Sequence, residues 1–325
     1  MRGVFLVKSL QRQGLDDPRS AFVKRVDLSK TRVRAFDGFV LLCGGKQEVD
    51  LLPVRSLRHM LYGEMTSGKY PDLAVRLKLA EEIQDWFQDG LYKDLVTFEE
   101  HLAGLSAVIV LVVESAGAIA ELGVFSVSKA FTDRVLVLVS EHHYEEDSFI
   151  KLGPLRRLEG ENEKSVLVYD WHASDEARTE DFEKVRGDLP EIIDAIAAYT
   201  HTDIGEQVFR RDGEAHVMLL MCELCHLFGA LSQTELSAYL TEMGLGVNER
   251  QVAQYLFVLS KCGLIGVKSK GHGRYYFAIE WRSRITFAYH PGAAINRERL
   301  ETDVVVYYAT CMTARFDVVR KIRAA

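Results

Sequence analysis

Val108-Ile-Val-Leu-Val-Val-Glu-Ser-Ala-Gly-Ala-Ile-Ala-Glu-Leu-Gly-Val-Phe125 is the stretch that decides the fold of this 325-residue chain. Its first part is an apolar, largely β-branched run without polar alternation, which predicts a parallel-sheet strand covered on both faces. Ser115-Ala116-Gly117 predicts a turn, and a helix follows with Glu121 in its first turn. Ligands of open α/β sheets bind at the carboxyl ends of the strands, so Glu114 and Glu121 are candidate site residues.

Glu121 has two interpretations at this level. The positive end of a helix dipole favours the ionised carboxylate, and an ionised carboxylate in a crevice can attack a sugar carbon. A Glu in a first helical turn is also an ordinary helix-start residue, worth on the order of a few tenths of a kcal/mol. The residue alone leaves both interpretations open.

Strands and helices alternate along the chain around this stretch. Phe39–Cys43 predicts a buried strand that ends in Gly44-Gly45, where paired glycines form a turn or let the backbone approach a ligand closely. Further strands are predicted at 134–140 and 165–169, and helices at 55–61, 77–86, 91–105, 118–130 and 189–199. Gly153-Pro154 is expected to end one element and precede another, and the polar residues 171–184 to form a linker. The alternation predicts an α/β fold with a doubly wound parallel sheet.

The C-terminal part follows a different pattern. Helices are predicted at 216–228, 232–240 and 248–260, and two short strands at 264–267 and 275–278 flank a basic, glycine-containing turn. Ser232 and Glu235 form a capping box at the second helix. Three helices and a basic hairpin predict a winged helix-turn-helix. Its candidate nucleic-acid contacts are Arg250, Gln251, Lys268, Lys270, His272 and Arg274.

Modules of this kind also serve as protein-interaction scaffolds alone. The third helix carries few charges, which favours docking on a nucleic-acid backbone or a structured nucleic acid over base reading. We therefore expect a basic N-terminal segment (1–35), a doubly wound domain (36–205) and a winged-helix domain with a C-terminal tail (206–325). The tail from residue 282 onward carries no pattern with a functional interpretation.

The balance of basic and acidic residues differs between the same three segments. Residues 1–35 carry nine Lys or Arg and three Asp, residues 36–205 sixteen basic and thirty-two acidic residues, and residues 206–325 fifteen and twelve. An acidic body does not attract polyanions in bulk, whereas the basic ends can act as local patches. The N-terminal patch is either a solvated, partly disordered arm or a nucleic-acid contact.

The composition predicts a soluble, cytoplasmic protein. No uninterrupted apolar stretch approaches the length of a membrane span, and the N-terminus lacks the core and cleavage site of a signal peptide. Cys222-Glu-Leu-Cys225-His226 matches a haem-attachment string, but it lies in an apolar helix in which cysteine acts as a small hydrophobe. We expect core packing there, with no metal site and no cofactor.

Three motifs together carry a family resemblance: Leu42-Cys43-Gly44-Gly45, the Glu114–Phe125 element, and Ser148-Phe149-Ile150 leading to Gly153-Pro154. The chain resembles the retron-associated effectors, which join a nucleoside 2-deoxyribosyltransferase-like domain to a winged-helix module. By motif the resemblance covers roughly residues 36–160, and by architecture the rest. Two departures are Ala116, where related effectors often have Pro, and Ala107, where an Asp is common.

The resemblance implies a toxic N-glycosidase. The Glu of the Glu-Leu-Gly element, Glu121, would be the nucleophile at the anomeric carbon. Glu114, Ser115 and Gly117 would line the base or ribose side, and Gly44 and Gly45 the floor. The implied substrate is NAD, a nucleotide or a nucleoside. A retron reverse transcriptase and its multicopy single-stranded DNA (msDNA), a branched RNA–DNA hybrid, would hold the toxin inactive.

A second class of function stays open. The glycosidase-like domain would then be a non-catalytic nucleotide-sensing module, and the winged helix would make the protein a DNA-binding regulator. No membrane partner is expected, and homo-oligomerisation is left open.

Overall fold

A computed structural model describes residues 16–34, 38–45, 54–82, 90–128, 131–145, 147–172, 179–201, 205–279 and 282–324. The chain divides into two compact units. The sheet unit comprises Phe36–Asp89 and Lys93–Asp203, and the helix–hairpin unit comprises Met1–Ala35, Gly90–Tyr92 and Ile204–Ala325. The short segment Gly90–Tyr92 thus lies in sequence between two parts of the sheet unit but packs with the other unit.

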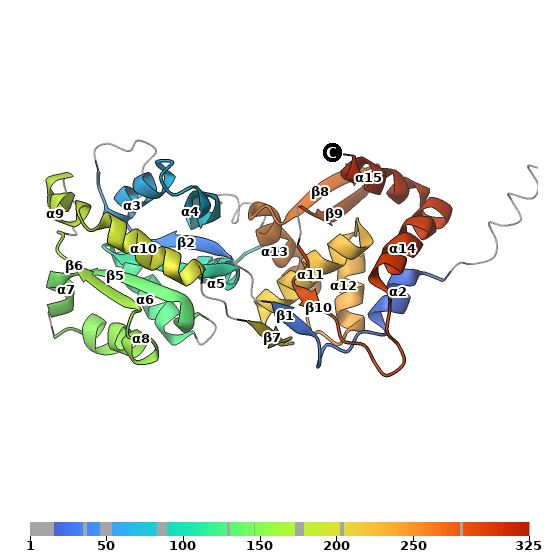
Figure 1. Cartoon of the computed structure of the whole chain (residues 1–325), viewed down its shortest axis with the longest axis horizontal. Coiled ribbons are helices and arrows are strands. Elements are labelled where there is room, and N and C mark those ends of the chain that lie inside the picture. The colour runs from blue at the N-terminus through green and yellow to red at the C-terminus, as the bar shows by residue number, and fades with distance from the viewer. Residues whose placement is uncertain are drawn as a thin grey trace, which may run out of the picture. The chain divides into compact units, whose positions relative to one another are not determined.

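The sheet unit contains five parallel strands in the order β3-β2-β4-β5-β6 (Figure 1). The strands are β2 (Phe39–Cys43), β3 (Leu77–Lys78), β4 (Ser106–Val113), β5 (Val135–Ser140) and β6 (Val166–Tyr169). Every residue of β2 and β5 is buried, as are all residues of β4 except Ala107. This confirms the prediction of central strands that are covered on both faces.

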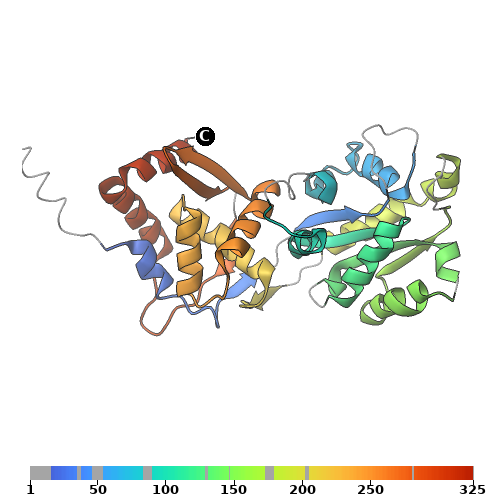
Figure 2. The same ribbon diagram turned by 180° about the vertical axis from the view of Figure 1, so that it is seen from behind.

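Helices cover both faces of this sheet. In Figure 1 α10 crosses in front of the strands, and the view from behind in Figure 2 has α6 in front. The helices of the unit are α3 (Leu57–Thr66), α4 (Pro71–Arg76), α5 (Leu95–Gly104), α6 (Ala116–Val127), α7 (Glu141–Glu145), α8 (Arg156–Glu161), α9 (Glu183–Arg186) and α10 (Leu189–Thr200). Shorter 3₁₀ turns are η1 (Ala80–Glu82), η3 (Thr132–Arg134) and η5 (Thr179–Phe182). Leu57, Val110 and Ile193 belong to one continuous core between α3, the sheet and α10.

Four local predictions in this unit are wrong. Within the predicted linker 171–184, residues 179–182 form η5 and residues 183–184 begin α9. Leu77 and Lys78, predicted as helix, form edge strand β3 because they pair with β2. Residues 91–94, also predicted as helix, precede α5, whose N-cap is Asp94. Gly153-Pro154 does not separate two elements, because both residues lie in the π-helical turn η4 (Lys151–Leu155), which continues directly into α8. The predicted helical residues 83–86 and the linker residues 173–178 lie outside the described part.

The helix–hairpin unit contains the three predicted helices and the hairpin. They are α11 (Glu214–Phe228), α12 (Gln233–Glu242), α13 (Glu249–Lys261), β8 (Ile265–Lys270) and β9 (Gly273–Ala278). β8 and β9 pair antiparallel, and Leu231, between α11 and α12, forms a bridge with Tyr276 of β9. The capping box of Ser232 and Glu235 at α12 is confirmed. Cys222 and Cys225 are free thiols in the buried core of α11, which confirms their packing role.

Segments near the two ends of the described part of the chain pack in this unit. The N-terminal α2 (Pro18–Val23) packs on α14 (Arg297–Cys311), and α15 (Thr313–Arg323) packs on α14 and β8. Strand β1 (Arg32–Arg34) joins β7 (Glu206–Val208) and β10 (Ile285–Thr286) in a small antiparallel sheet. Residues 16–34 therefore pack in the same unit as the C-terminal region, and residues 1–15 of the predicted basic segment lie outside the described part. No helix in the described ranges is both long and apolar enough to cross a membrane.

Candidate functional site

Glu114 holds two backbone segments together at the carboxyl end of β4. Its Oε1 accepts hydrogen bonds from the backbone N–H of Gly45 at 3.1 Å and of Arg58 at 3.1 Å, and its Oε2 accepts one from Leu57 at 2.8 Å. Burial raises the pKa of Glu114 to about 7, although the three N–H donors act to lower it. The carboxylate thus joins the turn after β2 to the N-terminus of α3.

Arg58 binds the same turn from the other side. Its side chain is only 1% exposed, and its guanidinium donates to the carbonyl of Leu42 at 2.8 and 3.1 Å and to that of Gly45 at 3.0 Å. Glu81 of η1 closes the arrangement as a bidentate acceptor at 2.6 and 2.7 Å. Burial raises the pKa of Glu81, but its hydrogen bonds to Arg58 outweigh burial and leave the pKa below its ordinary value.

Packing against neighbours requires the two glycines of this turn. Gly44 has φ +148°, and a Cβ there would lie 2.9 Å from the Cβ of Val112. A Cβ on Gly45 would lie 2.8 Å from Oε1 of Glu114. The interior of the unit therefore requires glycine at both positions, whether or not a ligand approaches them.

Glu121 lies in the second turn of α6, because the helix begins at Ala116 and not after Gly117 as predicted. Ser115 is the N-cap, and its Oγ accepts a hydrogen bond from the N–H of Ala118 at 3.1 Å. Gly117 is exposed in the first turn. Among the described residues, Oε2 of Glu121 is buried and has no hydrogen-bond partner. Of the two candidate acids, Glu114 is fully engaged by backbone donors and Glu121 retains a free oxygen.

The expectation that the helix terminus keeps Glu121 ionised is wrong. Burial, reinforced by the charges of Glu99 and Glu81, raises the pKa of Glu121 to about 8, while Arg58 acts to lower it. Glu99 of α5 is 8% exposed, and burial with the charge of Glu81 raises its pKa to about 7. A helix dipole falls off beyond the first turn, so desolvation dominates at Glu121. Burial raises the pKa of the Cys43 thiol, at the end of β2, and the charges of Glu121 and Glu99 add to this effect.

The sequence analysis did not identify Arg58, Glu81 or Glu99 as site residues. Glu99 could have been found, because Leu95, Phe98, Glu99 and Leu102 have the spacing of one helix face, and a carboxylate on an apolar face is unusual. The local sequence carries no signal for Arg58 or Glu81, since their partners are 13 to 23 residues away. Strongly shifted carboxyl groups gathered at the carboxyl ends of parallel strands are typical of a functional site.

Both candidate nucleic-acid contacts on α13 have structural partners inside the helix–hairpin unit. Arg250 donates to the carbonyls of Gly90 at 3.2 Å and of Leu91 at 2.9 Å, and Gln251 completes a capping box with Asn248. The other four lie on the hairpin: Lys268 is half-buried, Lys270 pairs with Asp317 of α15, and His272 and Arg274 are exposed. Among the described residues no group of three His, Cys, Asp or Glu side chains could hold a metal ion.

The sequence model of one protein family, the STM3845 retron effector protein, matches residues 54–267, which is more than half of the chain. The chain belongs to this family. The chain is also similar to two curated Escherichia coli proteins. It is 24% identical over 163 residues to the retron Ec73 putative ribosyltransferase/DNA-binding protein, covering 49% of this chain and 51% of that relative.

The second relative is the retron Ec86 putative ribosyltransferase/DNA-binding protein, 32% identical over 132 residues, which are 39% of each chain. The chain thus spans about half the length, or less, of the curated relatives it matches. The family match covers Arg58 and the carboxylates Glu81, Glu99, Glu114 and Glu121, together with α11 to α13, but ends within β8.

Proposed function

We propose that this retron effector is an N-glycosidase whose nucleophile is Glu121, on a nucleoside 2-deoxyribosyltransferase-like sheet unit. The observation that carries the proposal is the buried, unpartnered Oε2 of Glu121, surrounded by the charges of Glu99, Glu81 and Arg58. An unsatisfied carboxylate oxygen is unfavourable for stability, and such groups are concentrated at catalytic sites. The printed names of both relatives, putative ribosyltransferase, support glycosyl transfer.

The reaction has two steps. The Glu121 carboxylate forms a bond to C1′ while the bond from C1′ to the base nitrogen breaks, and that electron pair leaves with the base. Water then attacks C1′, the ester bond to Glu121 breaks with its electron pair returning to the carboxylate, and the water proton passes to solvent. A neutral nucleobase needs a proton as it leaves, and Glu99, with its pKa raised to about 7, is a group that can hold one.

The charges around Glu121 favour NAD among the substrates considered. Among the described residues, the charges that act on Glu121 are those of two further carboxylates, Glu99 and Glu81, and of one cation, Arg58. The nicotinamide ring of NAD carries a positive charge, which would lower the pKa of Glu121 on binding and thereby form the nucleophile. Nicotinamide also leaves as a neutral molecule and needs no proton. A neutral nucleobase has neither advantage.

The helix–hairpin unit is proposed to be a winged helix that docks on nucleic acid. Three helices, an antiparallel hairpin and the Leu231–Tyr276 bridge between the first two helices and the hairpin support this. The DNA-binding names of the relatives are consistent with it. As the regulatory partners we propose a retron reverse transcriptase and msDNA, which would keep the base-releasing site inactive.

Base release by the purified protein, freed of partners, tests the catalytic proposal. NAD and a set of deoxynucleotides are incubated with the wild type and with Glu121→Gln, and the free base is measured by chromatography. We expect release of nicotinamide from NAD at pH 8 and a loss of at least about a thousandfold in Glu121→Gln. Equal release by both proteins, or none from any substrate, would favour the non-catalytic DNA-binding regulator.

A further inference from the structure

The C-terminal helix α15 and the hairpin form one strongly basic surface. The hairpin strands and turn, Ile265–Ala278, contain no acidic residue, and α15 contains one, Asp317. We define the hairpin–α15 surface by five basic residues, Lys268 and Lys270 of β8 and Arg320, Lys321 and Arg323 of α15; Arg274 pairs with Ser269 and so lies on the opposite face of the hairpin. Asp317 pairs with Lys270 across the two elements and lies 3.9 Å from Arg320, which places the α15 cations beside those of β8.

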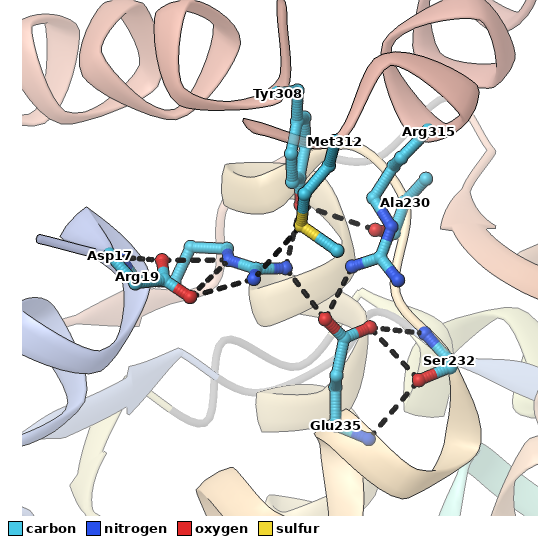
Figure 3. Close-up of polar contacts among 8 residues, drawn as sticks. All are labelled: Asp17, Arg19, Ala230, Ser232, Glu235, Tyr308, Met312 and Arg315. Carbon is cyan, nitrogen blue, oxygen red and sulfur yellow. Dashed lines mark hydrogen bonds and ion pairs between the residues drawn. The ribbon is translucent and has the colours of Figure 1, made fainter. Parts of the chain in front are cut away.

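α15 is anchored firmly to the rest of the unit. Figure 3 shows Arg315 directed at Glu235 of α12, to which it is ion-paired, and its guanidinium also lies over the ring of Tyr275 at 4.8 Å. Glu235 accepts a second ion pair, from Arg19 of α2 at 2.8 Å. Arg19 and Arg315 are 3% and 5% exposed, so this network is internal and holds α15 against the hairpin. Burial raises the pKa of Glu235, but its bonds to Arg315 and Ser232 leave the pKa below the ordinary value.

The cations of the hairpin–α15 surface are accessible, in contrast to this network. Arg320 has 70% of its side chain exposed, and Lys321 and Arg323 are also exposed. Arg320 and Lys321 follow Asp317 by three and four residues, so they share its side of the helix. The side chains that reach solvent here are thus mainly positive, with a single acid among them.

The face of α13 that would read bases in a winged helix is covered by the chain itself. Arg250 and Gln254 both donate to the carbonyl of Leu91, and the hydroxyl of Tyr92 donates to the carbonyl of Gln254 at 3.1 Å. Tyr92 is 2% exposed and its ring lies 6.1 Å from that of Phe257. Access to base edges in a major groove requires an open helix face, so α13 is unsuited to this role here.

We propose that the hairpin–α15 surface binds the phosphate backbone of duplex DNA without reading its sequence. Duplex is favoured over single strands because single-strand binding uses exposed aromatic platforms, whereas Tyr276 is buried and Tyr275 lies beneath Arg315. DNA is favoured by the DNA-binding names of both relatives. The inference deepens the nucleic-acid part of the proposed function and does not depend on base release.

Fluorescence anisotropy of the full-length protein with a 20-base-pair duplex of mixed sequence tests the proposal. The variant Arg320→Ala/Lys321→Ala/Arg323→Ala is expected to weaken binding by about tenfold to a hundredfold and to reduce the slope of log K against log salt by about 2 to 3. The matched control removes three exposed cations elsewhere in the unit, Lys24, Lys30 and Arg299, which are 67%, 73% and 83% exposed. Its affinity is expected to change less than threefold.

The variant Asp317→Asn is the decisive test, because it is expected to increase the affinity for the duplex. Removing the one acid of the surface frees Lys270 and is expected to tighten binding about twofold to fivefold, a gain that misfolding cannot produce. A second duplex of unrelated sequence should bind within about twofold, and the same sequences as single strands or duplex RNA should bind more weakly. The proposal is overturned by an unchanged or weaker Asp317→Asn, by an equal loss in the control, or by tighter binding of RNA or single strands. Base release from the same preparations reports separately on Glu121.

Discussion

Replacing Glu121 by Gln should stabilise the protein at alkaline pH, because the carboxyl group is held in an environment that opposes its charge. Its pKa is raised from 4.5 to about 8. Below pH 4.5 the group is protonated in both the folded and the unfolded chain. Between about pH 4.5 and 8 the unfolded chain loses this proton while the folded chain keeps it. The wild type therefore loses stability as the pH rises through this window and not beyond it.

The magnitude follows from the size of the shift. A shift of about 3.5 units would correspond to about 4 to 5 kcal/mol at 1.36 kcal/mol per unit, but Glu121 is only half-buried and solvent screens it. We expect Glu121→Gln to gain about 2 kcal/mol over the wild type between pH 5 and pH 9. Urea unfolding followed by circular dichroism at each pH measures this difference. In a Glu99→Gln background the gain should shrink, since one of the charges that raise the pKa of Glu121 is gone. A gain that is independent of pH, or a loss that grows with pH, would refute the reasoning.

Three further outcomes follow from the same contacts. Glu114→Gln replaces an acceptor oxygen by an amide donor that faces backbone N–H groups, so urea unfolding should show a loss of about 1 to 3 kcal/mol; unchanged stability would argue against its positioning role. Glu81→Gln removes a charge that raises the pKa of Glu121, so the acidic limb of the pH profile of kcat/KM for base release should move to lower pH, and an upward shift would contradict this. Arg250→Ala should lower the melting temperature by a few degrees, because the Arg250 guanidinium binds the carbonyls of Gly90 and Leu91, and should leave the duplex affinity within about twofold. A tenfold loss of duplex affinity, measured by anisotropy, would show that α13 takes part in nucleic-acid binding.

Strong local patterns predicted the framework of the fold. The run Val108–Val113 has no polar residue and is largely β-branched, which is typical of a strand covered on both faces, so β4 followed from the local sequence. The hairpin and the cap at Ser232 have equally local signals. Leu77 and Lys78 were misassigned because their pairing with β2, distant in sequence, overrides local helical spacing. Leu91 and Tyr92 form hydrogen bonds with α13, which lies about 160 residues away in the sequence, so local patterns could not predict this contact.

The candidate site was predictable only in part for the same reason. Glu121 follows from its motif, but its protonation depends on Arg58, Glu81 and Glu99, which other elements supply. The local sequence does not indicate that the Glu114 carboxylate accepts hydrogen bonds from three backbone N–H groups, one in the turn after β2 and two in α3. A charge balance set by long-range neighbours requires the three-dimensional structure.

Covalent trapping at Glu121 tests the central claim most directly. A 2′-fluoro arabinosyl analogue of the substrate slows hydrolysis of a glycosyl-enzyme more than its formation, so the intermediate accumulates. Intact-mass and peptide mass spectrometry of the trapped protein should then show one sugar attached to the peptide that contains Glu121, and none in Glu121→Gln. A sugar attached to a different residue, or base release by Glu121→Gln at the wild-type rate, would contradict the assignment of Glu121 as nucleophile.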